Sequence, residues 1–478
     1  LSNNNSCGWK KKINISKNSL QSILLQLECH FTWTLLKEDV DLDDLEETIC
    51  AQIEFLITKS KISNYNLLSY VKNLNGNNEE ALQSLQKAEA AAQRDHAGEV
   101  HRKSLVTWGN YAWIYYHMNK LQEAQTYVSK VKDSCKELSS TSCYKCQLPE
   151  VYCEEGWALL KFGKKYYERA KKCFEKALAK EPENPEFTSG YAIAMYRLED
   201  DLTKGSSLEP LRRAVTLNPN DTFVMSYLAL ELQDMAQVEE GEMYIKKALQ
   251  KTPDLTYVLR YAAMFYRRKR EVSKSLQFLE KALTFTPTSS FLHHQIGLCY
   301  RTKMYQLKKE TKQSSQEQVD LIRRCIFHFK AAVEKKPKFI YAYVDLANMY
   351  AEGKRYQEAE DTFQKVLKMK LTGQEKQQIH CRYGQFLEFH KKSEADAIKH
   401  FMEALKIEED ATRNMCMKAL KKLVEKRIQR GSADAADFGA LGFIHQLNGE
   451  KSEPLACCSA LEPAAGLWHG PAQPSRVA

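Results

Sequence analysis

The sequence predicts an all-α protein in which short helical hairpins stack on one another. Three observations predict this fold class: few helix-breaking residues, a repeated pattern of small and aromatic residues, and enough apolar residues for a core. Glycine (19) and proline (12) are scarce among the 478 residues, whereas sheet-rich and loop-rich proteins need more of both. Hydrophobic residues make up 43% and charged residues 27%, so we expect most of the chain to fold.

The repeated pattern has a period of about 34 residues, the length of a tetratricopeptide helix pair. Ala170, Phe174, Ala177 and Pro182 carry its second-helix signature in full. The small residues let two helices approach closely, the large residue fills the space beside them, and the proline ends the second helix. Stacked pairs form a right-handed superhelix with a concave groove. Partial copies of the signature are Ala81, Leu85 and Ala88; Ala214 and Pro219; Ala248 and Pro253; Ala282 and Pro287; Ala332 and Pro337; Ala359, Phe363 and Val366; and Ala397, Phe401 and Ala404.

Composition and motifs exclude several classes of protein. Lysine and arginine (70) exceed aspartate and glutamate (61), and this moderate surplus indicates a polyanion partner only where the basic residues cluster. There is neither a membrane-length apolar stretch nor a signal peptide, so we expect a cytoplasmic protein with no membrane contact. Cys143 and Cys146 form the one C-x-x-C pair, without a second pair to complete a zinc site. Phosphate-loop and hydrolase motifs are absent as well, so we expect no metal, cofactor or enzymatic activity.

The repeat register assigns one face of each first helix to the groove. Cations and aromatic rings alternate on this face, which suits single-stranded nucleic acid because guanidinium groups bind phosphates and rings stack on bases. Such grooves also bind acidic peptides, so an RNA-binding protein and a peptide-binding adaptor both stay open at this point. The groove residues are Glu186, Ile193, Tyr196 and Arg197; Phe223 and Gln233; Tyr257, Arg260, Met264, Arg267 and Arg268; and Phe291, His294 and Arg301.

Several long segments resemble the interferon-induced proteins with tetratricopeptide repeats. They are CHFTW at 29–33, SLVTWGNYAW at 104–113, EGWALLK at 155–161 and TPTSS at 286–290, and the likeness spans roughly residues 20–450. The closest similarity is to the cap-recognising branch and its near relative. The resemblance implies an antiviral protein whose superhelix encloses a positively charged central tunnel. The tunnel takes the 5′ end of single-stranded RNA, with a triphosphate or a cap lacking 2′-O-methylation, and the protein blocks translation of that RNA.

The resemblance also implies roles for particular residues. Phosphate contacts fall to Lys161 and Arg260, contacts near the ribose hydroxyls to Arg197, Tyr167 and His294, and further RNA contacts to Gln52, Thr58 and Gln295. In the cap pocket, Trp157 stacks on the base, Leu56, Thr58 and Ile193 form the wall, and Glu186 accepts from the base edge. The register adds Tyr257 and Arg267 to the RNA-binding set.

Some positions depart from the family or from the register. Asp221 stands beside the cap site where relatives often have asparagine, and Phe223 replaces a usual tyrosine. A carboxylate near phosphates adds repulsion, so cap binding is less secure than triphosphate binding. Thr48 replaces a family arginine. Trp157 and Lys161 fall at register positions that normally pack inside a repeat, so by register alone they are core residues.

The predicted organisation has four parts. Residues 20–285 form the RNA pocket, and 286–450 form the C-terminal helices. Residues 1–19 and 451–478 are expected to be disordered, and Pro454 falls inside the expected last helix. The family's Tyr-x-x-x-Leu docking motif is missing at residues 458–462, so binding to other family members would have to use other residues.

Overall fold

The computed structural model describes residues 16–55, 61–138, 140–199, 203–310, 316–407 and 410–447. Every regular element in these ranges is helical, which confirms the predicted all-α class. None of the described helices is both long and apolar enough to cross a membrane. The chain forms two compact units, Leu1–Lys269 and Arg270–Ala478. The predicted boundary at 285/286 and the enclosed tunnel stay predictions, and the tails expected to be disordered lie largely outside the described residues.

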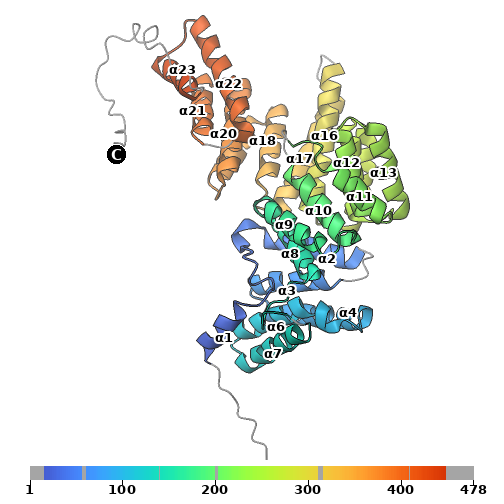
Figure 1. Ribbon diagram of the computed structural model, residues 1–478. Helices are drawn as coiled ribbons and strands as arrows, with labels where there is room; N and C mark the ends of the chain where they lie inside the picture. The colour runs from blue at the N-terminus through green and yellow to red at the C-terminus, as the bar shows by residue number, and fades with distance from the viewer. Residues whose placement is uncertain are drawn as a thin grey trace, which may run out of the picture. The chain divides into compact units, whose positions relative to one another are not determined.

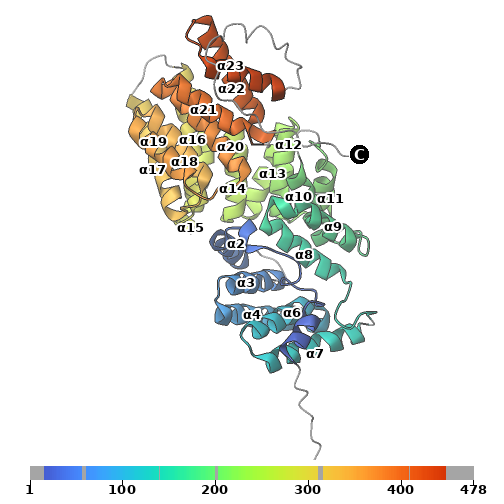
Figure 2. The same ribbon diagram turned by 90° about the vertical axis from the view of Figure 1, so that its left-hand side faces the viewer.

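The first unit is a series of helical hairpins. Its helices are α1 (Lys17–Leu24), η1 (Lys37–Asp39), α2 (Leu42–Phe55), α3 (Ile62–Leu74), α4 (Asn78–Asp95), α5 (Val100–Lys103), α6 (Leu105–His117), α7 (Leu121–Glu137), α8 (Pro149–Phe162), η2 (Lys164–Tyr166), α9 (Tyr167–Leu178), α10 (Pro185–Leu198), α11 (Leu208–Leu217), α12 (Thr222–Asp234), α13 (Val238–Lys251) and α14 (Thr256–Arg268). Sequential helices pair, as α3 does with α4 and α8 with α9. Figures 1 and 2 show α3 beside α4 and α6.

Phe174 on α9 shows why the repeat pattern produces these hairpins. Its ring is 0% exposed and lies between two glycines of neighbouring first helices, Gly156 on α8 and Gly190 on α10. A Cβ atom at Gly156 would lie 2.7 Å from the ring, and one at Gly190 would lie 2.2 Å from it. Carbon atoms do not pack this closely, so the ring requires glycine on both helices. The large residue of the repeat therefore locks one hairpin to the next.

The second unit repeats the same construction. Its helices are α15 (Val272–Phe285), α16 (Ser290–Glu310), α17 (Gln316–Lys335), α18 (Ile340–Glu352), α19 (Tyr356–Leu367), α20 (Gly373–Phe386), the π-helix η3 (Leu387–Lys391), α21 (Glu394–Leu405), α22 (Asp410–Gln429) and α23 (Ala435–Leu447). Helices α17, α18 and α19 lie side by side (Figure 2). Phe329 packs against Gly297, and Phe401 against Gly384, with the geometry seen at Phe174.

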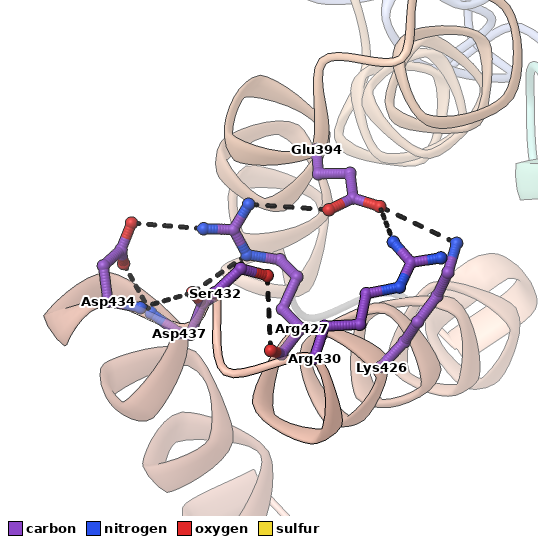
Figure 3. A network of polar contacts seen from close by, with 7 residues as sticks. All are labelled: Glu394, Lys426, Arg427, Arg430, Ser432, Asp434 and Asp437. Atoms are coloured by element: carbon purple, nitrogen blue, oxygen red, sulfur yellow. Dashed lines mark hydrogen bonds and ion pairs between the residues drawn. The ribbon is translucent and has the colours of Figure 1, made fainter.

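A network of charged residues fastens the last described helix (Figure 3). Arg427 near the end of α22 donates from Nε to both carboxylate oxygens of Asp437 on α23, at 3.0 and 2.9 Å. Asp437 is 0% exposed and also accepts from the backbone N–H of Asp434 at 2.8 Å. Glu394 on α21 lies 3.6 Å from Arg427 and 3.2 Å from Arg430. These contacts tie α21, α22 and α23 together.

Candidate nucleic-acid interface

Lys161 on α8 and Arg197 on α10 are half-buried cations of the first unit. The Lys161 Nζ donates to Asn64 Oδ1 at 2.8 Å. Arg197 donates from Nη1 to the Leu160 carbonyl at 2.8 Å and from Nη2 to the Tyr227 hydroxyl at 2.9 Å. Among the described residues, neither cation forms an ion pair with a carboxylate. Positive charge that is removed from water and paired only with neutral groups favours an anionic ligand.

The electrostatics of α8 agree with this interpretation. Burial, together with the neighbouring Arg197 charge, lowers the pKa of Lys161 to about 8, while Glu154 opposes the shift. Burial also raises the pKa of Glu154 to about 7, although this carboxylate accepts from Asn66 Nδ2 at 2.8 Å. Two groups on one helix therefore titrate close to neutral pH. Such shifts are typical of functional sites.

Aromatic rings line the region around Arg197. We call Phe223 and Tyr227 on α12 and Tyr257 and Tyr261 on α14 the ring cluster. The Phe223 and Tyr257 rings stack with centroids 4.0 Å apart, and those of Tyr257 and Tyr261 stack at 4.4 Å. The Arg197 guanidinium lies 5.5 Å from the centroid of Tyr167. Rings beside cations are the components that hold single-stranded nucleic acid.

Arg260 lies on α14 between Tyr257 and Tyr261 in the chain. It is half-buried, and burial lowers the pKa of its guanidinium, while the nearby tyrosines oppose this shift. The structure therefore brings Lys161, Arg197, Tyr167, Tyr257 and Arg260 into one unit, with Arg197 in direct contact with Tyr167 and the ring cluster.

The predicted cap-pocket residues occupy different environments. Trp157 is half-buried and packs edge-to-face on Phe174, with ring centroids 5.4 Å apart. Ile193 is 0% exposed, so in this conformation it offers no surface to a ligand, although the register places it on the groove face. Glu186 is exposed as a residue, yet its carboxyl is partly surrounded by protein, and this desolvation raises its pKa.

Asp221 has a structural task that the sequence interpretation missed. It is the N-cap of α12: its Oδ1 accepts from the backbone N–H groups of Phe223 at 3.0 Å and Val224 at 3.1 Å. Its Oδ2 lies 3.3 Å from the Ser189 hydroxyl. Burial raises the pKa of this carboxyl. The Asp221 carboxylate is therefore directed at backbone N–H donors. The repulsion between this carboxylate and a phosphate ligand stays a prediction.

The other predicted residues are more scattered. Gln52 on α2 and Arg267 on α14 are half-buried, whereas Leu56 and Thr58 lie outside the described residues. His294 and Gln295 are on α16 in the second unit. His294 is buried, and its Nε2 lies 2.8 Å from Asp345 Oδ2, so this ring nitrogen already has a partner.

Sequence reasoning missed four residues of this region: Tyr227, Tyr261 and Asn64 contact predicted residues, and Asn66 contacts Glu154. Tyr227 and Tyr261 stand at the same repeat position in successive hairpins, a coincidence that the register could have revealed. Asn64 and Asn66 on α3 had no such signal, because nothing local indicates that they face α8.

Comparisons with known proteins agree with this fold. Stacked hairpins with a cationic, ring-lined face place the chain among the tetratricopeptide-repeat proteins, and family models described as "Tetratricopeptide repeat" match residues 153–221 and 340–372. "Antiviral innate immune response effector IFIT1" of Macaca fascicularis is 51% identical over 92% of this chain and 95% of the relative. The chain belongs to the family of interferon-induced proteins with tetratricopeptide repeats.

Two solved structures are also similar. A monomeric mutant of IFIT1 with Gppp-AAAA has a TM-score of 0.82 and 50% identity, covering 90% of this chain and 96% of that one. The human IFIT1 dimer with PPP-AAAA has a TM-score of 0.78 and 49% identity, with the same coverage.

Proposed function

We propose that this protein captures the 5′ end of single-stranded RNA, bearing a triphosphate or a cap without 2′-O-methylation, and blocks translation of that RNA. It acts as an antiviral effector in the cytoplasm and catalyses no reaction. The observation that carries the proposal is the pair of half-buried cations, Lys161 and Arg197, which have no carboxylate partner among the described residues. The IFIT1 structures with Gppp-AAAA and PPP-AAAA support it.

In this proposal the site residues divide into three groups. Lys161 and Arg260 bind the 5′ phosphates, since a cation removed from water binds an anion more strongly than a solvated one does. Arg197, Tyr167 and Tyr257 bind the first nucleotides by hydrogen bonds and stacking, and further contacts come from Gln52, Thr58, Arg267, His294 and Gln295. A cap guanine stacks on Trp157 beside Leu56, Ile193, Glu186 and Asp221. Because Ile193 is fully buried, the cap pocket requires a local movement that exposes it.

A gel-shift series with one RNA sequence tests this function. The RNA carries a 5′ triphosphate, a 5′ hydroxyl, an unmethylated cap or a 2′-O-methylated cap. We expect triphosphate RNA to bind at least about 100-fold more tightly than hydroxyl RNA, because charge-assisted hydrogen bonds to several phosphate oxygens are lost with the hydroxyl end. The unmethylated cap should bind more tightly than the methylated one. Equal binding of all four RNAs would reject end recognition and leave a peptide-binding adaptor as the better account.

A further inference from the structure

We propose that Asn64 is a positioning residue that holds the Lys161 ammonium in place for a phosphate without neutralising it. This inference rests on the proposed function of Lys161 as a phosphate ligand. Asn64 lies in the first turn of α3 and is 8% exposed, and Lys161 lies in the last turn of α8. Their contact, 2.8 Å between Nζ and Oδ1, joins residues 97 positions apart in the chain.

The amide of asparagine suits this positioning role better than an aspartate or an alanine would. A lysine ammonium has three N–H donors, and the Asn64 carbonyl uses one of them, so the others stay available to phosphate oxygens. An aspartate at this position would form an ion pair and compete with the ligand. An alanine would leave the flexible lysine stem without an anchor, and the ligand would then have to restrict its rotamers.

A second amide on α3 binds Glu154, the carboxylate whose charge acts on Lys161. Asn66, two residues after Asn64, donates to Glu154 Oε1 at 2.8 Å, and Glu154 lies on α8 two turns before Lys161. Among the described residues, Lys161 and Glu154 form no ion pair. Lys161 and Glu154 of the same helix therefore each bind a different asparagine of α3.

The other charged and titratable groups facing Lys161 are Arg197 from α10 and His30 from the segment after α1. Burial, together with the Lys161 charge, lowers the pKa of His30 to about 3, so this ring is neutral at physiological pH. Since burial and Arg197 lower the pKa of Lys161 to about 8, its charge is lost as the pH rises from 7 to 9. The affinity for a phosphate end should fall over the same interval, because only the ammonium form binds it.

The test compares Asn64→Asp and Asn64→Ala with the wild type and with Asn75→Asp. Asn75 is the exposed C-cap of the same helix, so Asn75→Asp adds the same charge away from Lys161. Affinity for a short 5′-triphosphate RNA is measured at pH 7, 8 and 9 and at constant ionic strength, with a 5′-hydroxyl RNA as reference. Circular dichroism checks that each variant folds.

The wild type and Asn75→Asp should each lose about tenfold in affinity between pH 7 and pH 9. Asn64→Asp should bind about tenfold more weakly than the wild type at pH 7 and change little up to pH 9, because the new carboxylate raises the pKa of Lys161. Asn64→Ala should bind more weakly at pH 7 and keep the pH dependence. Wild-type affinity and pH profile in Asn64→Asp, or wild-type affinity in Asn64→Ala, would overturn the proposal. If the wild type binds both RNAs equally, the proposed function itself fails, and this result is distinguishable from the others.

Discussion

Substitution of Lys161 by methionine is expected to reduce the affinity for 5′-triphosphate RNA by about 100-fold and, at the same time, to stabilise the free protein. The loss corresponds to about 3 kcal/mol, the size of a desolvated charge-assisted contact with phosphate. Stabilisation by about 1–2 kcal/mol follows because methionine keeps the apolar stem and removes a charge that, within the described part of the chain, hydrogen-bonds to a neutral amide and to no carboxylate. Fluorescence anisotropy and thermal denaturation measure the two effects.

The pKa of Lys161 fixes the pH range of this stabilisation. Its folded-state pKa, about 8, lies below the ordinary value of 10.5, so the folded protein binds this proton less tightly than the unfolded chain does. The charged form therefore opposes folding below pH 8, and this penalty diminishes as the pH rises toward the ordinary pKa. The gain from methionine should be largest at pH 7 and smaller at pH 9.

Lys165→Met is the matched control. Lys165 is exposed, four residues further along the chain, and paired with Asp39 at 2.8 Å. Removing an exposed pair changes stability by less than about 1 kcal/mol, and RNA affinity should stay nearly constant. If Lys161→Met instead lowers both stability and affinity, Lys161 is a structural residue, as the repeat register alone suggests.

Substitution of Asp437 by alanine is expected to destabilise the end of the second unit by about 3 kcal/mol. The carboxylate is fully buried and accepts from Arg427 and from the Asp434 backbone, so its removal breaks a charge-assisted hydrogen bond and a backbone hydrogen bond at a buried position. Hydrogen exchange of the amides in α22 and α23 measures this effect locally, and protection should decrease there first.

Asp320→Ala is the control for this second substitution. Asp320 is exposed and contacts Arg323 at 3.3 Å on the same helix, α17, a pair whose loss changes stability by about 0.5 kcal/mol or less. Equal protection in Asp437→Ala and Asp320→Ala would contradict a fastening role for the network.

Sequence alone predicted those features that depend on the repeat. The spacing of Ala170, Phe174 and Ala177 identified the hairpin, and the packing of Phe174 against Gly156 and Gly190 shows the physical basis of that spacing. The register also predicted that Arg197 and Tyr257 lie on first helices of different repeats, and they do, on α10 and α14. Residues at the contacts between hairpins recur with the period of the repeat, so their role can be predicted from the sequence.

Features that depend on distant packing were not predictable in this way. The Asn64–Lys161 contact joins α3 to α8, and no local pattern links the two positions. Ile193 was assigned to an open groove, but its environment depends on neighbours that the register does not specify, and it is fully buried. The capping role of Asp221 was also missed, although an aspartate directly before a helix is a standard N-cap and the sequence could have indicated it.

A cycle that combines a protein change with a ligand change tests the central claim, that Lys161, which has no carboxylate partner among the described residues, binds the 5′ phosphates. The four binding free energies are those of the wild type and Lys161→Met, each with triphosphate and hydroxyl RNA. We predict a coupling of about 2 kcal/mol or more, because the lysine contributes only when the triphosphate is present. A coupling near zero, with both RNAs weakened equally, would place the phosphate end elsewhere and contradict the account.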